Sequence, residues 1–190
     1  MEDRHVKILG IAGSTRDGSF NRMALAAAAQ QLPPGSTLEV FELHDMPLYA
    51  QQHETLLPAA VSDLKAAVEG ADAILFATPE HNASISAALK SAIDWGSRPM
   101  GRNSWAGKVS AVIGASPGAL GTVRAQGQLR QIMAALDMVV VSQPDVLIGA
   151  ARDKFGVNGS LVDEKARALL GQLMTRLVDT ARTLRQGAAQ

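Results

Sequence analysis

The sequence of 190 residues contains no cysteine, and its basic and acidic residues are equal in number at 18 each. The absence of cysteine excludes disulfides, thiol redox chemistry and thiolate metal sites, so a redox reaction would need a bound cofactor. The balanced charge offers no broad basic surface. We therefore expect neither nucleic acid nor an anionic membrane as a partner.

Long apolar runs, metal-ligand spacings and a targeting signal are also missing. No apolar run reaches the length of about 18 residues that a transmembrane helix needs. The four histidines have no close ligand spacing, so no structural metal is expected. The first residues lack the basic start and apolar core of a secretory signal, which predicts a cytoplasmic protein.

Short apolar runs alternate with amphipathic segments along the chain. The runs predict strands at residues 6–12, 37–43, 71–78, 108–115 and 138–141. The amphipathic segments predict helices at residues 19–31, 56–69, 84–95, 121–136 and 163–184. This alternation is typical of a doubly wound α/β domain. We expect residues 1–190 to form a single flavodoxin-like domain, with a five-stranded parallel sheet and helices on both faces.

A loop rich in glycine and serine joins the first expected strand to the first expected helix. Gly13 and Gly18 allow the backbone amides to turn inward around an anion, and the helix N-terminus adds partial positive charge. Donor side chains are available on Ser14, Arg16, Ser19 and Asn21. The loop has neither a Walker A pattern nor Gly-x-Gly-x-x-Gly. It predicts a phosphate site; the alternative is an ordinary strand-to-helix turn that Ser19 caps.

Two further loops follow the expected strands at 71–78 and 108–115. They read Pro79-Glu80-His81-Asn82 and Ser116-Pro117-Gly118-Ala119-Leu120-Gly121. Loops at the carboxyl ends of neighbouring parallel strands meet in one crevice, so these two should lie beside the phosphate loop. Their free amides and small residues suit a planar heterocycle such as a flavin. Taken singly, they would be a polar strand-to-helix turn and a flexible glycine turn.

The three motifs together resemble those of the NADPH-dependent FMN reductase family, flavodoxin-like flavoproteins that include bacterial quinone, chromate and azo reductases. The family's phosphate loop, Gly-Ser-x-Arg-x-x-Ser-x-Asn, is matched by Gly13, Ser14, Arg16, Ser19 and Asn21. Its ring loop and the helix behind it are matched by residues 78–84 and 89–95. Its later segment is matched by residues 114–118, 124–126 and 129–131.

The resemblance implies a noncovalent FMN as cofactor and NAD(P)H as cosubstrate, with the flavin carrying the chemistry. Hydride would pass from NAD(P)H to flavin N5 and then, in a ping-pong sequence, to a quinone, flavin, azo, nitro or metal-oxyanion acceptor. The residues implied to hold the phosphate are Ser14, Arg16, Ser19 and Asn21, with Phe20 beside them. Those implied around the ring are Pro79, Glu80, His81, Asn82, Ser84 and Ile85 on one side, and Ser116 and Gly118 on the other.

The chain departs from the family at the ring loop. His81 and Ala83 replace two tyrosines, and Ser86-Ala87 replaces the usual Pro-Gly. Losing both aromatics should widen the substrate pocket, to which we assign His81, Ala83 and Arg98. His81 could hydrogen-bond a quinone oxygen or supply a proton, or it could point to solvent. Arg98 could meet the phosphates of a nicotinamide cofactor, or be an ordinary solvated arginine.

The assembly and two competing functions stay open. Some family members are tetramers joined by Arg, Tyr and Glu, whose positions hold Arg124, Gly127 and Asp145 here, so a homodimer and a homotetramer are both expected. A flavodoxin-like electron carrier would bind FMN without reacting with NAD(P)H, but the aromatic content of 4% and the zero net charge disfavour it. The intact phosphate loop disfavours a flavin-free interaction protein.

Overall fold

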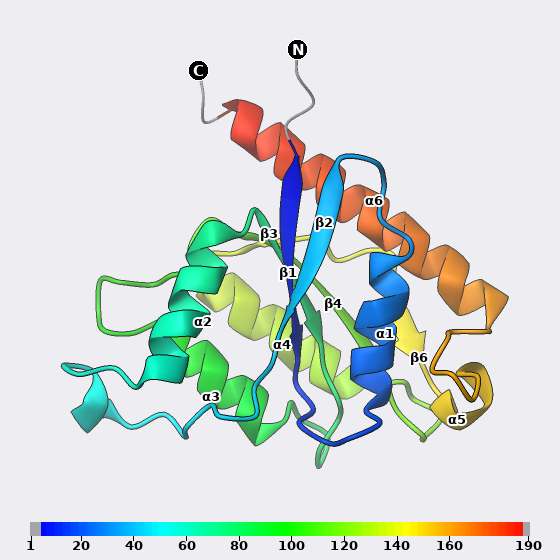
Figure 1. The fold of residues 1–190 in the computed structure, drawn as a ribbon, viewed down its shortest axis with the longest axis horizontal. Coiled ribbons are helices and arrows are strands. Elements are labelled where there is room, and N and C mark those ends of the chain that lie inside the picture. The colour runs from blue at the N-terminus through cyan, green and yellow to red at the C-terminus, as the bar shows by residue number, and fades with distance from the viewer. Residues whose placement is uncertain (1–4, 188–190) are drawn as a thin grey trace.

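A parallel sheet runs through the centre of the computed structural model, which describes residues 5–187 (Figure 1). Residues 188–190 and residues 1–4, part of the segment considered above for targeting, lie outside the description. The strands are β1 (Val6–Ala12), β2 (Ser36–Phe41), β3 (Ala73–Ala77), β4 (Val109–Ala115), β5 (Val139–Val140) and β6 (Val146–Ile148). Their order, β2-β1-β3-β4-β5 with β6 also beside β4, is the flavodoxin-like order and confirms the predicted fold class.

The fifth position of the sheet is divided between two short strands. β5 pairs with the start of β4, and β6 pairs with its end. The interruption contains Pro144, which has no amide hydrogen to donate to a neighbouring strand. The predicted strand at 138–141 is therefore shorter than expected, and β6 was not predicted from the sequence.

Helices cover both faces of the sheet, as predicted. α1 (Phe20–Ala29) and α6 (Glu164–Gly187) pack on one face, and α2 (Ala59–Gly70), α3 (Ala87–Gly96) and α4 (Val123–Ala135) on the other (Figure 1). Burial on both faces explains why the central strands read as unbroken apolar runs, since β3 and β4 are buried throughout. The short helices are η1 (Gln51–His53) and α5 (Ala151–Lys154). Within residues 5–187, no helix combines the length and apolarity needed to cross a membrane.

The later starts of α3 and α4, compared with the prediction, lengthen the second and third loops at the carboxyl edge. α3 begins at Ala87 because Ser86 caps it, accepting a hydrogen bond from the Leu89 amide at 3.2 Å. α4 begins at Val123 because the two preceding residues, Gly121 and Thr122, have φ angles of 55° and 69°, outside the helical range. Both shifts move residues from a helix into the region where the candidate site lies.

Candidate functional site

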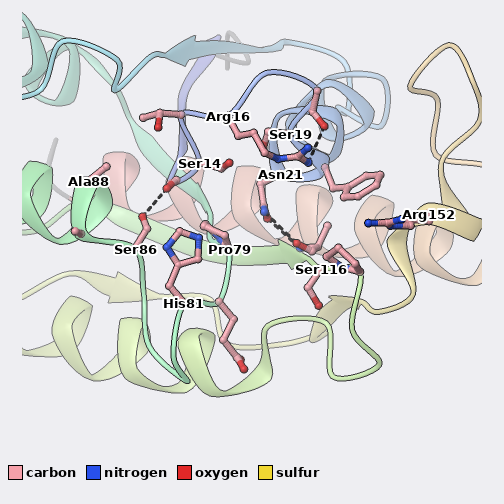
Figure 2. Close-up of a pocket in the computed structure, with 18 residues that line it drawn as sticks. Ser14, Arg16, Ser19, Asn21, Pro79, His81, Ser86, Ala88, Ser116 and Arg152 are labelled. Carbon is pink, nitrogen blue, oxygen red and sulfur yellow. Dashed lines mark hydrogen bonds between the residues drawn. The ribbon is translucent and has the colours of Figure 1, made fainter.

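The three loops singled out in the sequence meet at the carboxyl edge of the sheet and enclose a cavity of about 620 Å³ (Figure 2). Ligand pockets commonly have volumes of about 300–1,000 Å³. The predicted residues that line the cavity are Ser14, Arg16, Ser19, Phe20, Asn21, Pro79, Glu80, His81 and Ser116. The remaining lining residues are Gly13, Thr15, Gly18, Ser86, Ala87, Ala88, Ala115, Pro117 and Arg152.

The first loop presents hydrogen-bond donors at the N-terminus of α1. Ser19 is the N-cap of this helix and accepts a hydrogen bond from the Arg22 amide at 3.4 Å. The cap and the phosphate site, alternatives in the sequence analysis, are therefore compatible, because the Ser19 hydroxyl keeps its own proton to donate. Arg16 donates to the Gly18 carbonyl at 3.0 Å, and its guanidinium lies 5.9 Å from the centre of the Phe20 ring.

Asn21 joins the first loop to the end of β4. Its side chain is 3% exposed, and its Nδ2 donates to the Ala115 carbonyl at 3.0 Å. The Ala115 amide donates in turn to Asn21 Oδ1 at 2.9 Å. The oxygen and one N–H of this amide are thus already engaged, which leaves a single N–H for a ligand. The geometry gives Asn21 a structural role that the motif alone did not indicate.

Ser86 joins the first loop to the second. Its hydroxyl donates to the Gly13 carbonyl at 2.5 Å while its oxygen caps α3 (Figure 2). Gly13 is required for this close approach, because a Cβ there would lie 2.9 Å from Pro79 Cδ. The serine that departs from the family's Pro-Gly pattern therefore does two structural tasks in this chain.

The carboxylate of Glu80 points away from the cavity and into the N-terminus of α4. It accepts hydrogen bonds from the Arg124 side chain at 2.7 Å and from the Arg124 and Ala125 amides at 3.0 and 3.3 Å. Burial acts to raise the pKa of Glu80, but these hydrogen bonds outweigh it and hold the pKa below its usual range. A ring contact from Glu80 could thus come only from its backbone or the base of its side chain.

Replacing Glu80 by glutamine should destabilise the protein in a pH-dependent way. Because folding lowers the pKa of Glu80, its carboxylate stabilises the folded state at pH values above its unfolded-state pKa. This contribution is lost as the pH falls through the lower pKa of the folded state. We expect Glu80→Gln to lower the free energy of unfolding by about 1–2 kcal/mol at pH 7. Urea unfolding should show this difference shrinking below about pH 4. An equal difference at pH 7 and pH 3 would contradict the assignment.

Residues 81–84 form a tight two-residue turn at the mouth of the cavity. The His81 and Ser84 backbones exchange hydrogen bonds at 2.9 and 3.0 Å. The central residues, Asn82 and Ala83, have φ angles of 51° and 63°, the left-handed values of a type I′ turn. Gln128 on α4 fixes the turn, since it donates to the Ala83 carbonyl at 3.0 Å and accepts from the Ser84 hydroxyl at 2.6 Å.

This turn separates the predicted ring residues into two groups. His81 lines the main cavity and also a second cavity of about 520 Å³ between α3 and α4. Three other predicted residues, Asn82, Ser84 and Ile85, line only the second cavity of these two. Figure 2 shows the His81 imidazole reaching into the main cavity beside Pro79. The assignment of all these residues to one ring surface stays a prediction.

Three predicted residues lie outside both cavities. Gly118 accepts a hydrogen bond from the Ala150 amide at 2.9 Å, and Ala83 sits at the tip of the turn. Arg98 lies in the loop after α3, where its amide donates to the Trp95 carbonyl at 3.1 Å. The substrate pocket predicted from His81, Ala83 and Arg98 therefore has only His81 on the main cavity.

Several other lining residues were not predicted from the sequence. Ala87 and Ala88 belong to the first turn of α3, which was placed too early in the chain, and a serine before a helix could have indicated the Ser86 cap. Arg152 comes from α5, more than 30 residues beyond the third loop, and no local pattern connects it with the site.

The fold and the cavity define a flavodoxin-like α/β protein with a loop of hydrogen-bond donors at the N-terminus of its first helix. The chain belongs to the NADPH-dependent FMN reductase family, whose family model matches residues 6–153. This membership confirms the resemblance found in the motifs. The protein is accordingly an NAD(P)H-dependent oxidoreductase with FMN as its cofactor.

Similar proteins cover almost the whole chain. It is 43% identical over 181 residues to an NAD(P)H-dependent FMN reductase from Pseudomonas aeruginosa, which covers 95% of this chain and 97% of the relative. It is 37% identical over 171 residues to a 2-hydroxy-1,4-benzoquinone reductase from Burkholderia, with 90% and 93% covered. FerB, a flavoenzyme NAD(P)H:(acceptor) oxidoreductase from Paracoccus denitrificans, has a similar solved structure, with a TM-score of 0.86, 32% identity, and 94% and 98% covered.

Proposed function

We propose that this enzyme passes electrons from NAD(P)H to a small quinone, using one FMN held in the cavity of the three loops. The quinone is favoured because a 2-hydroxy-1,4-benzoquinone reductase is among the relatives. When bound, FMN would supply the redox chemistry, namely hydride transfer from NAD(P)H at N5 and then, in a ping-pong order, to the acceptor. The other acceptors considered above, free flavins, azo and nitro compounds and metal oxyanions, are the competing substrates.

The observation that carries this proposal is the donor set of the cavity. Hydroxyl and guanidinium donors from Ser14, Arg16 and Ser19 gather at the N-terminus of α1, where an anion is stabilised by the helix dipole. Glu80 is the only acidic residue that lines the cavity within residues 5–187, and its carboxylate is bound to Arg124 and to the N-terminus of α4. The lining therefore fits a phosphate, and Pro79, Ala88 and Pro117 supply apolar surface suited to a flat ring.

The protein's own residues hold and align the reactants in this proposal. Asn21 and Ser86 fix the spacing of the three loops through their bonds to Ala115 and Gly13. His81 is the side chain proposed to hydrogen-bond the quinone, because it is exposed at the turn and lines the cavity. An imidazole there could also deliver a proton as the quinone oxygen gains charge.

The test is anaerobic reduction of the purified protein by NADPH and by NADH, followed by mixing with 1,4-benzoquinone. We expect flavin absorption bands that bleach within seconds of adding a nicotinamide donor and return on adding quinone. Bands that resist both donors would instead identify an electron carrier. Bleaching without reoxidation by quinone would exclude quinones as the acceptor, and the same assay then extends to the competing substrates.

We also propose that the enzyme is a cytoplasmic homodimer or homotetramer. The proposed compartment follows from the nicotinamide donor, which is supplied inside the cell. Two residues at the family's tetramer positions already have partners within the chain: Arg124 pairs with Glu80, and Asp145 pairs with Arg130 at 2.6 Å. A tetramer interface built on Arg124 and Asp145 would have to share these ion-pair partners. We therefore expect light scattering to give the mass of a dimer.

A further inference from the structure

Arg152 is a cation on the wall of the main cavity that belongs to none of the three motifs. It lies on α5, and its side chain is exposed. Figure 2 shows its guanidinium extending from α5 toward the cavity, on the side away from His81. Within residues 5–187, no hydrogen bond or ion pair joins the Arg152 side chain to another residue. Its charge is thus available to a ligand.

The third loop holds the start of α5 in place. The Ser116 amide donates to the Ile148 carbonyl at 3.0 Å, the Ala150 amide to Gly118 at 2.9 Å, and the Ala151 amide to Ser116 at 3.0 Å. Phe155, just after α5, stacks on Phe20 with ring centres 5.6 Å apart. These contacts join α5 both to the third loop and to the phosphate loop, so the position of Arg152 relative to the cavity is built into the fold.

A phosphate in this cavity would carry more negative charge than Arg16 alone can balance. A phosphate monoester carries a charge of about −1.5 to −2 at pH 7. Arg16 alone supplies one positive charge, and it also donates to the Gly18 carbonyl. Arg16 lies over the Phe20 ring, and both Phe20 and Arg152 line the same cavity. Two guanidiniums match the charge of the ligand better than one.

We propose that Arg152 is the second phosphate-binding arginine of the site and contacts the FMN phosphate from α5. This inference rests on the proposed location of FMN. The same chemistry could recognise the phosphates of the nicotinamide donor instead. We assign the FMN phosphate because Arg152 shares the cavity wall with Phe20, which follows the α1 cap directly.

The test compares FMN with riboflavin, which lacks the phosphate. Holoenzyme carrying either flavin is diluted in steps, and the fluorescence of released flavin gives each dissociation constant. We expect Arg152→Gln to weaken FMN binding at least about 10-fold, the lower end for a hydrogen bond to a charged group. Riboflavin binding should change less than about twofold, because the lost contact is to phosphate. The FMN dissociation constant of Arg152→Lys should lie between those of Arg152→Gln and the parent protein.

Lys154→Gln is the matched control. It removes one positive charge from the same short helix, where Lys154 Nζ lies 3.8 Å from Asp163 Oδ2. It should leave the affinities for FMN and riboflavin unchanged. An FMN affinity within twofold of the parent in Arg152→Gln would overturn the inference, as would equal weakening of both flavins. A raised KM for NADPH with unchanged FMN binding would move Arg152 to the donor and also overturn it. A parent protein that binds neither flavin would instead defeat the proposed function.

Discussion

Replacing Gly149 by alanine is expected to lower the free energy of unfolding by about 3 kcal/mol, the upper end of the usual cost of overpacking. A Cβ at this position would lie 2.1 Å from the Ala119 carbonyl oxygen and 2.7 Å from its carbon. Both neighbours are backbone atoms of the third loop, so the loop itself must move. Urea unfolding of the parent protein and of Gly149→Ala measures the loss of stability. The FMN dissociation constant of the variant should also rise, because Ser116 and Pro117 of the third loop line the cavity.

Gly127→Ala is the control for this prediction. Gly127 lies within α4, and among the described residues no atom outside its chain neighbours and its own helix backbone lies within 4 Å of where its Cβ would be. The same chemical change should therefore stabilise the protein by about 0.5–1 kcal/mol, since alanine is the better helix former. Destabilisation of both variants to the same extent would show that the close contact at Gly149 is not the cause.

The second large effect is expected at Asn21. Asn21→Ala removes the partner of both the amide and the carbonyl of Ala115, which are buried at the end of β4. Each unsatisfied buried group costs about 1–3 kcal/mol, so we expect a loss of about 2–4 kcal/mol in the free energy of unfolding. The measurement is urea unfolding followed by circular dichroism.

Added FMN separates the structural role of Asn21 from a ligand contact. If Asn21 mainly joins the loops, the destabilisation persists at every FMN concentration, because the broken bonds lie within the protein. If it acted only by binding phosphate, variant and parent would unfold alike without added FMN and diverge as FMN is added. Asn21→Asp is a useful companion, because it keeps the shape but sets an oxygen against the Ala115 carbonyl, and it should be as destabilising as alanine.

The fold was predictable because its determinants are local. β1, β3 and β4 are short apolar runs that end at loops with glycine or proline, and Ser19 marks the start of α1. Strands that alternate with helices leave few alternatives to a parallel doubly wound sheet. β6 was missed because three residues carry no periodicity, and its existence depends on pairing with the end of β4.

The candidate site was predictable only in part. Its phosphate loop is contiguous in the sequence, so Ser14, Arg16 and Ser19 could be assigned together. The direction of the Glu80 carboxylate could not, because it depends on Arg124, 44 residues away and brought near by the folding of α4. Arg152 could not be found either, since its place on the cavity wall depends on hydrogen bonds between the third loop and the residues leading into α5.

The bonds that Asn21 and Ser86 make between the loops bear on the thermodynamics of ligand binding. They tie the phosphate loop to β4 and to α3 through contacts within the protein itself. Ordering a flexible loop on binding costs conformational entropy, which is subtracted from the affinity. With the three loops already held together, most of this entropy is lost during folding and little remains to be lost when a ligand arrives. Calorimetry should therefore record only a small entropic penalty for FMN binding.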